Sequence, residues 1–174
     1  MVHTEILETP SIKADQAVWT SYGSATINKP ADTVWRAIRD FRSWKVWNEY
    51  TPEVTTKTGT NEVAVGDQVT VHYRPEPTGT ISQIPCTAMT VSDAERTLCW
   101  RGEPFGVPAW LLLPEKVQRV TPKGDDSCLY EIFETQSGPM SYLVKWGMGA
   151  KQSAMNQGIA DALRRYAEGE SGNK

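Results

Sequence analysis

The sequence has 174 residues, of which 39% are hydrophobic and 22% charged, as is typical of one soluble globular domain. The formal net charge of -3 gives no basic surface signature, so we expect no nucleic-acid partner. Residues 1–16 lack the basic flank and apolar run of a secretory signal, and no stretch approaches the ~20 apolar residues that span a bilayer. We therefore expect a cytoplasmic protein without a membrane span.

Sequence motifs for metal or nucleotide binding do not occur. The three cysteines, Cys86, Cys99 and Cys128, are widely spaced, and there are only two histidines, which argues against a disulfide framework and a zinc site. We interpret the thiols as small hydrophobic groups on strands. Gly147-Met148-Gly149 lacks the third glycine of a dinucleotide fingerprint, and neither a phosphate-loop motif nor a serine-hydrolase elbow is present. We predict no metal site and no cofactor.

A strand and two short helices are predicted in the first third of the chain. After an N-terminal extension over residues 1–16, residues 17–28 are rich in strand-forming side chains. Pro30 suits the first position of a helix, and the residues that follow it show the spacing of one buried helical face. Residues 41–50 predict a second short helix, which Pro52 ends because it restricts the residue before it.

Glycine and proline divide the middle of the chain into short strands. We expect strands at 54–58, 68–74, 86–92, 97–102, 115–120 and 127–137. Turns of hairpin length between neighbours predict a mostly antiparallel sheet of six or seven strands. Alternation places Val69 and Tyr73 on one face, whereas His72, Arg74 and Arg101 are expected on the solvent-exposed outer face.

A long helix is predicted from residue 139 or 141 to residue 168, followed by a tail at 169–174. Its apolar stripe recurs at helical spacing, with one seven-residue gap, and comprises Met140, Leu143, Val144, Met148, Met155, Ile159, Leu163 and Tyr166. Gly147, Gly149 and Gly158 each disfavour a helix. Either the helix kinks there, or the glycines admit a neighbour close to its surface.

Several short motifs occur in an order that is similar to a known family. They include Ala25-Thr-Ile-Asn-Lys-Pro30, Trp47-Asn48, Leu98-Cys-Trp-Arg-Gly102 and Ala154-Met-Asn156. With the order of elements, they resemble the START-like or SRPBCC (helix-grip) superfamily, in particular its polyketide cyclase/dehydrase branch. The resemblance implies an α+β domain at 17–168, in which a curved antiparallel sheet wraps the terminal helix around a cavity for a small hydrophobic molecule.

Strand alternation would gather a polar cluster in such a cavity. Lys116 and Gln118 share one face of their strand, and Tyr130, Glu134 and Gln136 share one face of the next strand. Glu134 is our candidate general base, and Lys116 and Tyr130 are candidate donors to an enolate oxygen. An exposed cross-strand ion pair accounts for the same residues equally well, because a one-residue register shift would move them all outside.

Further candidates for the substrate-binding wall are large apolar side chains, for which cavity and core positions both remain open. Besides Gln118 and Gln136, they are Tyr73, Met89, Trp100, Phe105, Trp110 and Met155. Prolines disfavour regular structure across the apolar segment 105–113. We favour a lid over the cavity for this segment, and a homodimer contact or simple core packing remains open.

Three functions fit these features. The first is a cofactor-independent cyclase or dehydratase that acts on a small polyketide- or terpenoid-like substrate by general acid/base catalysis. The second is a carrier for a lipid-like ligand, and the third is a protein-interaction module. The polarity of the cavity wall discriminates between them, since an enzyme requires convergent polar groups.

Overall fold

The computed structural model describes residues 5–57, 59 and 62–170, and within them seven strands form one antiparallel sheet. The spatial order of the strands is β1-β7-β6-β5-β4-β3-β2. The strands are β1 Ala17–Ile27, β2 Glu53–Thr56, β3 Gln68–Tyr73, β4 Ser82–Ser92, β5 Thr97–Gly102, β6 Leu113–Pro122 and β7 Cys128–Ser137. The helices are α1 Ala31–Arg39, α2 Trp44–Trp47 and α3 Met140–Glu168, with single 3-10 turns η1 Phe41–Ser43 and η2 Pro104–Gly106. The predicted α+β helix-grip fold is confirmed.

Three predicted elements have clearly different bounds in the structure. The second helix ends at Trp47, because the Asn48 side-chain oxygen accepts a hydrogen bond from the Thr51 backbone nitrogen at 2.8 Å and turns the chain toward β2. β4 begins at Ser82, before the predicted residue 86, because its first residues pair with β3. The strand predicted over 54–58 is the shorter β2, and residue 58 lies outside the described residues.

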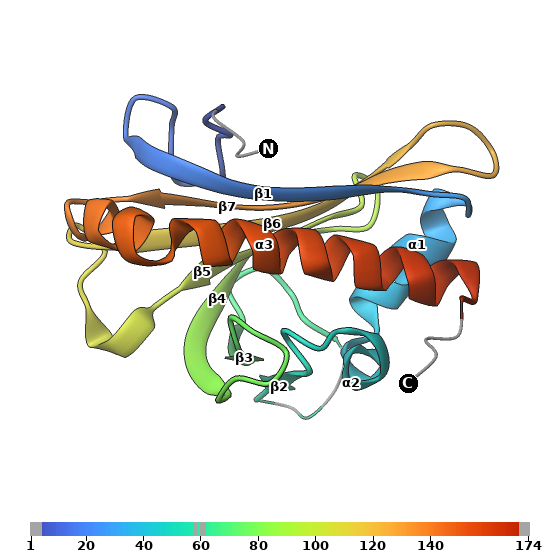
Figure 1. The fold of residues 1–174 in the computed structure, drawn as a ribbon, viewed down its shortest axis with the longest axis horizontal. Coiled ribbons are helices and arrows are strands. Elements are labelled where there is room, and N and C mark those ends of the chain that lie inside the picture. Colours follow the sequence, from blue (N-terminus) through green and yellow to red (C-terminus); the bar gives the residue numbers. More distant parts are fainter. Residues whose placement is uncertain (1–4, 58, 60–61, 171–174) are drawn as a thin grey trace.

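α3 lies along β1 on the concave side of the sheet (Figure 1). Met155, Ile159 and Leu163 of the predicted stripe are buried, whereas Leu143 is 69% exposed and Tyr166 is 41% exposed. The first turns of α3 cover a cavity, so only a narrow face of the helix touches protein there. The predicted stripe is therefore correct from Met155 to Leu163, and it is too wide in the N-terminal half of α3 and at Tyr166.

Gly158 of α3 admits a close neighbour, and the helix is one continuous element. A Cβ atom at Gly158 would lie 2.5 Å from the ring of Tyr50, so the absence of a side chain lets this aromatic ring pack on the helix. Where α3 packs on β1, the close approach is made possible by a glycine of the strand, because Gly23 lies against the backbone of Asn156. Of the two alternatives for the helical glycines, close packing is observed at Gly158, whereas Gly147 has open space around it.

The N-terminal extension covers the outer face of the sheet. Thr9 Oγ1 donates a hydrogen bond to Glu115 Oε2 at 2.6 Å, and the Ser11 backbone nitrogen donates to the same oxygen at 3.0 Å. Arg101 Nε donates to Glu115 Oε1 at 3.0 Å, so the fully buried carboxylate has both oxygens satisfied. Arg101 therefore lies on the outer face, as predicted, but under a covering segment.

His72 also points to the outer face, where Thr55 Oγ1 and His72 Nε2 lie 3.0 Å apart. Its side chain is 16% exposed, less than the predicted solvent-facing position implies, because β2 packs beside it. In the part of the chain that the structure describes, no helix has the length and apolar character needed to cross a membrane.

Candidate functional site

A cavity of about 210 Å³ lies between α3 and the concave face of the sheet. Its wall is mostly apolar and includes the predicted residues Tyr73, Trp100 and Met155. Pro104 and Leu112 also line it, so the segment between β5 and β6 contributes to its rim. The apolar wall is typical of a small-molecule site, and the volume is below the roughly 300–1,000 Å³ of pockets for drug-sized ligands, which favours a small ligand.

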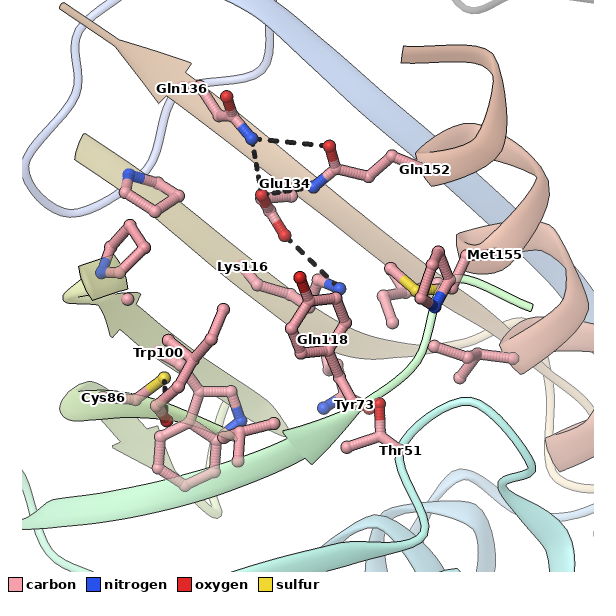
Figure 2. A pocket seen from close by; sticks show the side chains of 18 of the residues that line it. Thr51, Tyr73, Cys86, Trp100, Lys116, Gln118, Glu134, Gln136, Gln152 and Met155 are labelled. Atoms are coloured by element: carbon pink, nitrogen blue, oxygen red, sulfur yellow. Dashed lines mark hydrogen bonds and ion pairs between the residues drawn. The ribbon is translucent and has the colours of Figure 1, made fainter. Parts of the chain in front are cut away.

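A polar cluster interrupts the apolar wall on one side (Figure 2). Lys116 of β6 and Glu134 of β7 are directly paired across the two strands, and Lys116 Nζ lies 3.3 Å from Glu134 Oε2. Gln136 Nε2 donates a hydrogen bond to Glu134 Oε1 at 2.8 Å, and Gln152 Nε2 donates to the same oxygen. We name Lys116, Glu134, Gln136 and Gln152 the Glu134 cluster.

Three donors therefore converge on the Glu134 carboxylate. One is a cationic ammonium and two are side-chain amides, which are the partners that an ionised carboxylate accepts. The side chains of Glu134 and Lys116 are only 12% and 20% exposed. A carboxylate held in this way beside an apolar cavity can accept a proton from a ligand, and the neighbouring ammonium can return one.

Gln152 was not among the residues predicted from the sequence. It comes from α3, whereas the candidate polar residues were sought on strands. A signal was present, because Gln152 falls in the seven-residue gap between Met148 and Met155 of the apolar stripe. Both of these methionines line the cavity, so Gln152 occupies the position between them on the same helical face.

Tyr73 reaches the cavity from β3. Burial raises the pKa of the Tyr73 hydroxyl, and the negative charge of Glu134 raises it further. The hydroxyl has no hydrogen-bond partner within the described residues. It is therefore protonated at neutral pH and available as a hydrogen-bond donor to a ligand.

Tyr130 lies behind the cavity wall. It is fully buried, and its hydroxyl donates a hydrogen bond to Gln118 Oε1 at 2.7 Å. Gln118 itself lines the cavity. The placement of Tyr130 is thus a correction: alternation gives the correct face, but at this level the strand is covered by core side chains and the hydroxyl contacts protein.

Two other predicted wall residues lie elsewhere, and one cannot be placed. Met89 packs with Cys99, Val117 and Phe133 in a cluster on the outer face, because it alternates with Cys86 and Ala88, whose side chains belong to the core on the concave side. Trp110 is 73% exposed, because the segment around it runs along the rim. The side chain of Phe105 lies outside the described part of the structure.

The three cysteines are free and buried. Cys86 lines the cavity, where burial, aided by the charge of Glu134, raises the pKa of its thiol to about 12. Burial also raises the pKa values of the Cys99 and Cys128 thiols. Across the described residues, no three His, Cys, Asp or Glu side chains gather in a way that could hold a metal ion.

We expect the native protein to react slowly with a thiol reagent at pH 8, because the reactive thiolate is scarce at each buried cysteine. The measurement is the colour released by 5,5′-dithiobis(2-nitrobenzoate). In denaturant all three thiols should react within minutes. Rapid release of one equivalent from the native protein would instead identify an activated cysteine.

A family model described as "Polyketide cyclase / dehydrase and lipid transport" matches residues 19–168 of the chain. The chain belongs to this family. The match confirms the superfamily suggested by the sequence motifs, and it includes every residue of the Glu134 cluster.

Known proteins of similar sequence and fold extend this comparison. The chain is 28% identical to oxopyrrolidines biosynthesis cluster protein O of Penicillium oxalicum, over 94% of each chain. Its fold is similar to a hypothetical protein of Helicobacter pylori, with a TM-score of 0.71, 15% identity and coverage of 96% of this chain and 99% of the other. It is also similar to norcoclaurine synthase of Thalictrum flavum, with a TM-score of 0.62, 14% identity and coverage of 99% and 100%. At these identities the structural matches establish the fold.

Proposed function

We propose that the protein is a cyclase-type enzyme that acts on a small, oxygen-bearing hydrophobic substrate by general acid/base catalysis. The observation that carries this proposal is the Glu134 carboxylate, held by three donors at the wall of an otherwise apolar cavity. The family description and the Penicillium relative, which is named after a biosynthesis cluster, support a biosynthetic role.

The cluster suits an intramolecular aldol-type reaction. Glu134 removes a proton from the carbon next to a substrate carbonyl, and the electron pair of the broken C–H bond forms an enolate. Lys116 or Tyr73 donates a hydrogen bond to the enolate oxygen as charge develops on it. The enolate carbon then attacks a second carbonyl of the same molecule, which forms the ring bond and an alkoxide.

A proton transfer completes the cycle. Lys116 can protonate the alkoxide, and the protonated Glu134 can return its proton to the lysine across their 3.3 Å contact. In a dehydratase, Lys116, left neutral after it protonates the alkoxide, would remove the second proton from the carbon between the carbonyl and the new hydroxyl group, and the electron pair of that C–H bond would form the C=C bond. Glu134 would deliver its proton to the hydroxyl group, which leaves as water, so both residues return to their starting state. Both routes conserve all protons within the substrate and the Glu134–Lys116 pair.

A carrier function is the second candidate, and the predominantly apolar cavity wall favours it. The family description also names lipid transport. A carrier would retain a ligand without exchanging its protons. The interaction-module hypothesis requires a filled core, which the open cavity argues against.

The experiment that tests the enzyme proposal is deuterium exchange at a carbon next to a carbonyl. The protein is incubated with 1-tetralone in D₂O, and NMR follows loss of the protons beside the ketone. We expect exchange at least about tenfold faster than in buffer, because a positioned base typically gives larger factors. Binding of 1-tetralone without faster exchange would favour the carrier.

A further inference from the structure

A second polar region occurs on the cavity wall, away from the Glu134 carboxylate. Gln118 of β6 and Trp100 of β5 are 2% and 4% exposed, and both line the cavity. The indole nitrogen of Trp100 has no hydrogen-bond partner among the described residues. The side-chain oxygen of Gln118 accepts a hydrogen bond from the Tyr130 hydroxyl. Among the described residues, the side-chain nitrogen of Gln118 has no hydrogen-bond partner. The wall thus carries two unused hydrogen-bond donors.

Tyr130 fixes the orientation of Gln118. Tyr130 is fully buried, and burial raises the pKa of its hydroxyl well above the ordinary value. The hydroxyl therefore stays protonated and donates a hydrogen bond to Gln118 Oε1. A side-chain amide has its acceptor and its donor on opposite sides. With the oxygen held by Tyr130, the NH₂ group of Gln118 is the end left for the cavity.

The register of the sheet brings the two donors together. Trp100 is paired with Lys116 across β5 and β6, and Gln118 lies two residues further along the same face of β6. Trp100 and Gln118 are therefore diagonal neighbours on the concave face, where long side chains are within reach of each other. Figure 2 shows both side chains at the cavity, with Lys116 between Gln118 and Glu134.

We propose that Gln118 and Trp100 form a subsite for an oxygen acceptor of the ligand, a carbonyl or hydroxyl oxygen, and that Tyr130 is its positioning residue. The indole N–H of Trp100 is buried without an acceptor, which is costly. A ligand oxygen that accepts from this N–H and from the amide of Gln118 would satisfy both donors. The apolar surroundings strengthen such hydrogen bonds because water does not compete.

The subsite narrows the substrate class. This step rests on the proposed function, which places one substrate carbonyl at Glu134 and Lys116. A second oxygen at Gln118 and Trp100 requires a molecule with at least two oxygen functions on an apolar skeleton. A polycarbonyl compound meets this requirement, whereas a hydrocarbon-like lipid with a single polar end does not.

The test compares two probes that differ by one carbonyl, 1-tetralone and tetralin, by isothermal titration calorimetry. We expect the unmodified protein to bind 1-tetralone about tenfold more tightly, as one well-placed hydrogen bond gives. In Gln118→Leu the preference should fall severalfold, because the single carbonyl of 1-tetralone then has only the Lys116 donor of the Glu134 cluster left to bind, with tetralin binding unchanged. Gln83→Leu, an exposed glutamine on β4 of the same sheet, is the matched control and should keep the full preference.

Two further variants guard against a misfolded Gln118→Leu protein. Trp100→Phe removes the indole N–H and should lower the preference severalfold, and Tyr130→Phe should lower it by releasing the Gln118 amide. Equal binding of both probes to the unmodified protein would overturn the proposal, as would no measurable binding of either probe. A preference that survives Gln118→Leu but disappears in Lys116→Met would assign the oxygen to the Glu134 cluster instead.

This measurement is independent of turnover. If 1-tetralone shows the expected preference but no proton exchange, the subsite stands and the enzyme proposal fails. If exchange occurs without any effect of Gln118→Leu on the preference, the enzyme proposal stands and the subsite fails.

Discussion

Glu134→Gln is expected to lower the rate of proton exchange and of substrate conversion by about 10² or more, while the fold and ligand binding persist. The amide has nearly the shape of the carboxylate, and its oxygen can still accept a hydrogen bond from Gln152 or Lys116. It cannot accept a substrate proton at neutral pH. The rate is measured by NMR exchange of 1-tetralone, and binding by calorimetry on the same samples.

The matched control is Glu131→Gln on the same strand. Glu131 faces the opposite side of β7, where it pairs with Arg119 at 2.8 Å and accepts from the Tyr22 hydroxyl at 3.0 Å. Its loss removes the same charge from the protein without touching the cavity, so exchange should stay within about twofold of the unmodified rate. An undiminished rate in Glu134→Gln would exclude this residue as the base.

The fold was predictable from the sequence because its signals are local and periodic. Glycine and proline mark the turns, and the helical spacing of Met155, Ile159 and Leu163 identifies the buried face of α3. A sheet made of consecutive hairpins leaves little choice of topology once its strands are known. The end of the second helix was missed because it depends on one side-chain contact, between Asn48 and Thr51.

The candidate site was predictable only as far as strand parity determines it. Alternation alone puts Lys116 and Glu134 on one face, and the structure places both at the cavity. Parity does not show how deeply a side chain is buried. Tyr130 lies on the same face, yet its hydroxyl ends inside the core, which alternation could not predict. Met89 was a candidate because its side chain is large and apolar, whereas alternation with Cys86 and Ala88 places it on the outer face.

Contacts between distant segments were beyond sequence reasoning. Gln152 joins Glu134 only because α3 crosses the concave face at that level, and nothing in the local pattern specifies the crossing. The outer face is a similar case, since Thr9 covers Glu115 across more than a hundred residues of chain. Such pairings depend on how whole elements pack against one another.

Gly23→Ala is expected to destabilise the protein by about 3 kcal/mol, at the upper end of the usual cost of overpacking. A Cβ atom at this position would lie 2.5 Å from the Asn156 carbonyl oxygen, and the obstacle is helix backbone, which cannot rotate away as a side chain does. α3 must therefore move off β1. The buried hydrogen bond from Asn156 Nδ2 to Ser21 Oγ, 3.0 Å long, would be stretched as well. Urea denaturation followed by tryptophan fluorescence measures the change in unfolding free energy.

Gly147→Ala in α3 is the control, and it is expected to change the unfolding free energy in the opposite direction. A Cβ atom there meets no other atom within 4 Å, so alanine should raise the unfolding free energy by up to about 1 kcal/mol through its better helix propensity. A Gly23→Ala protein as stable as the unmodified one would contradict the close approach of α3 to β1. Because α3 also carries Gln152 to Glu134, the shift forced by alanine at position 23 should weaken that contact and slow proton exchange before the protein unfolds. Gly147→Ala should leave the exchange rate unchanged.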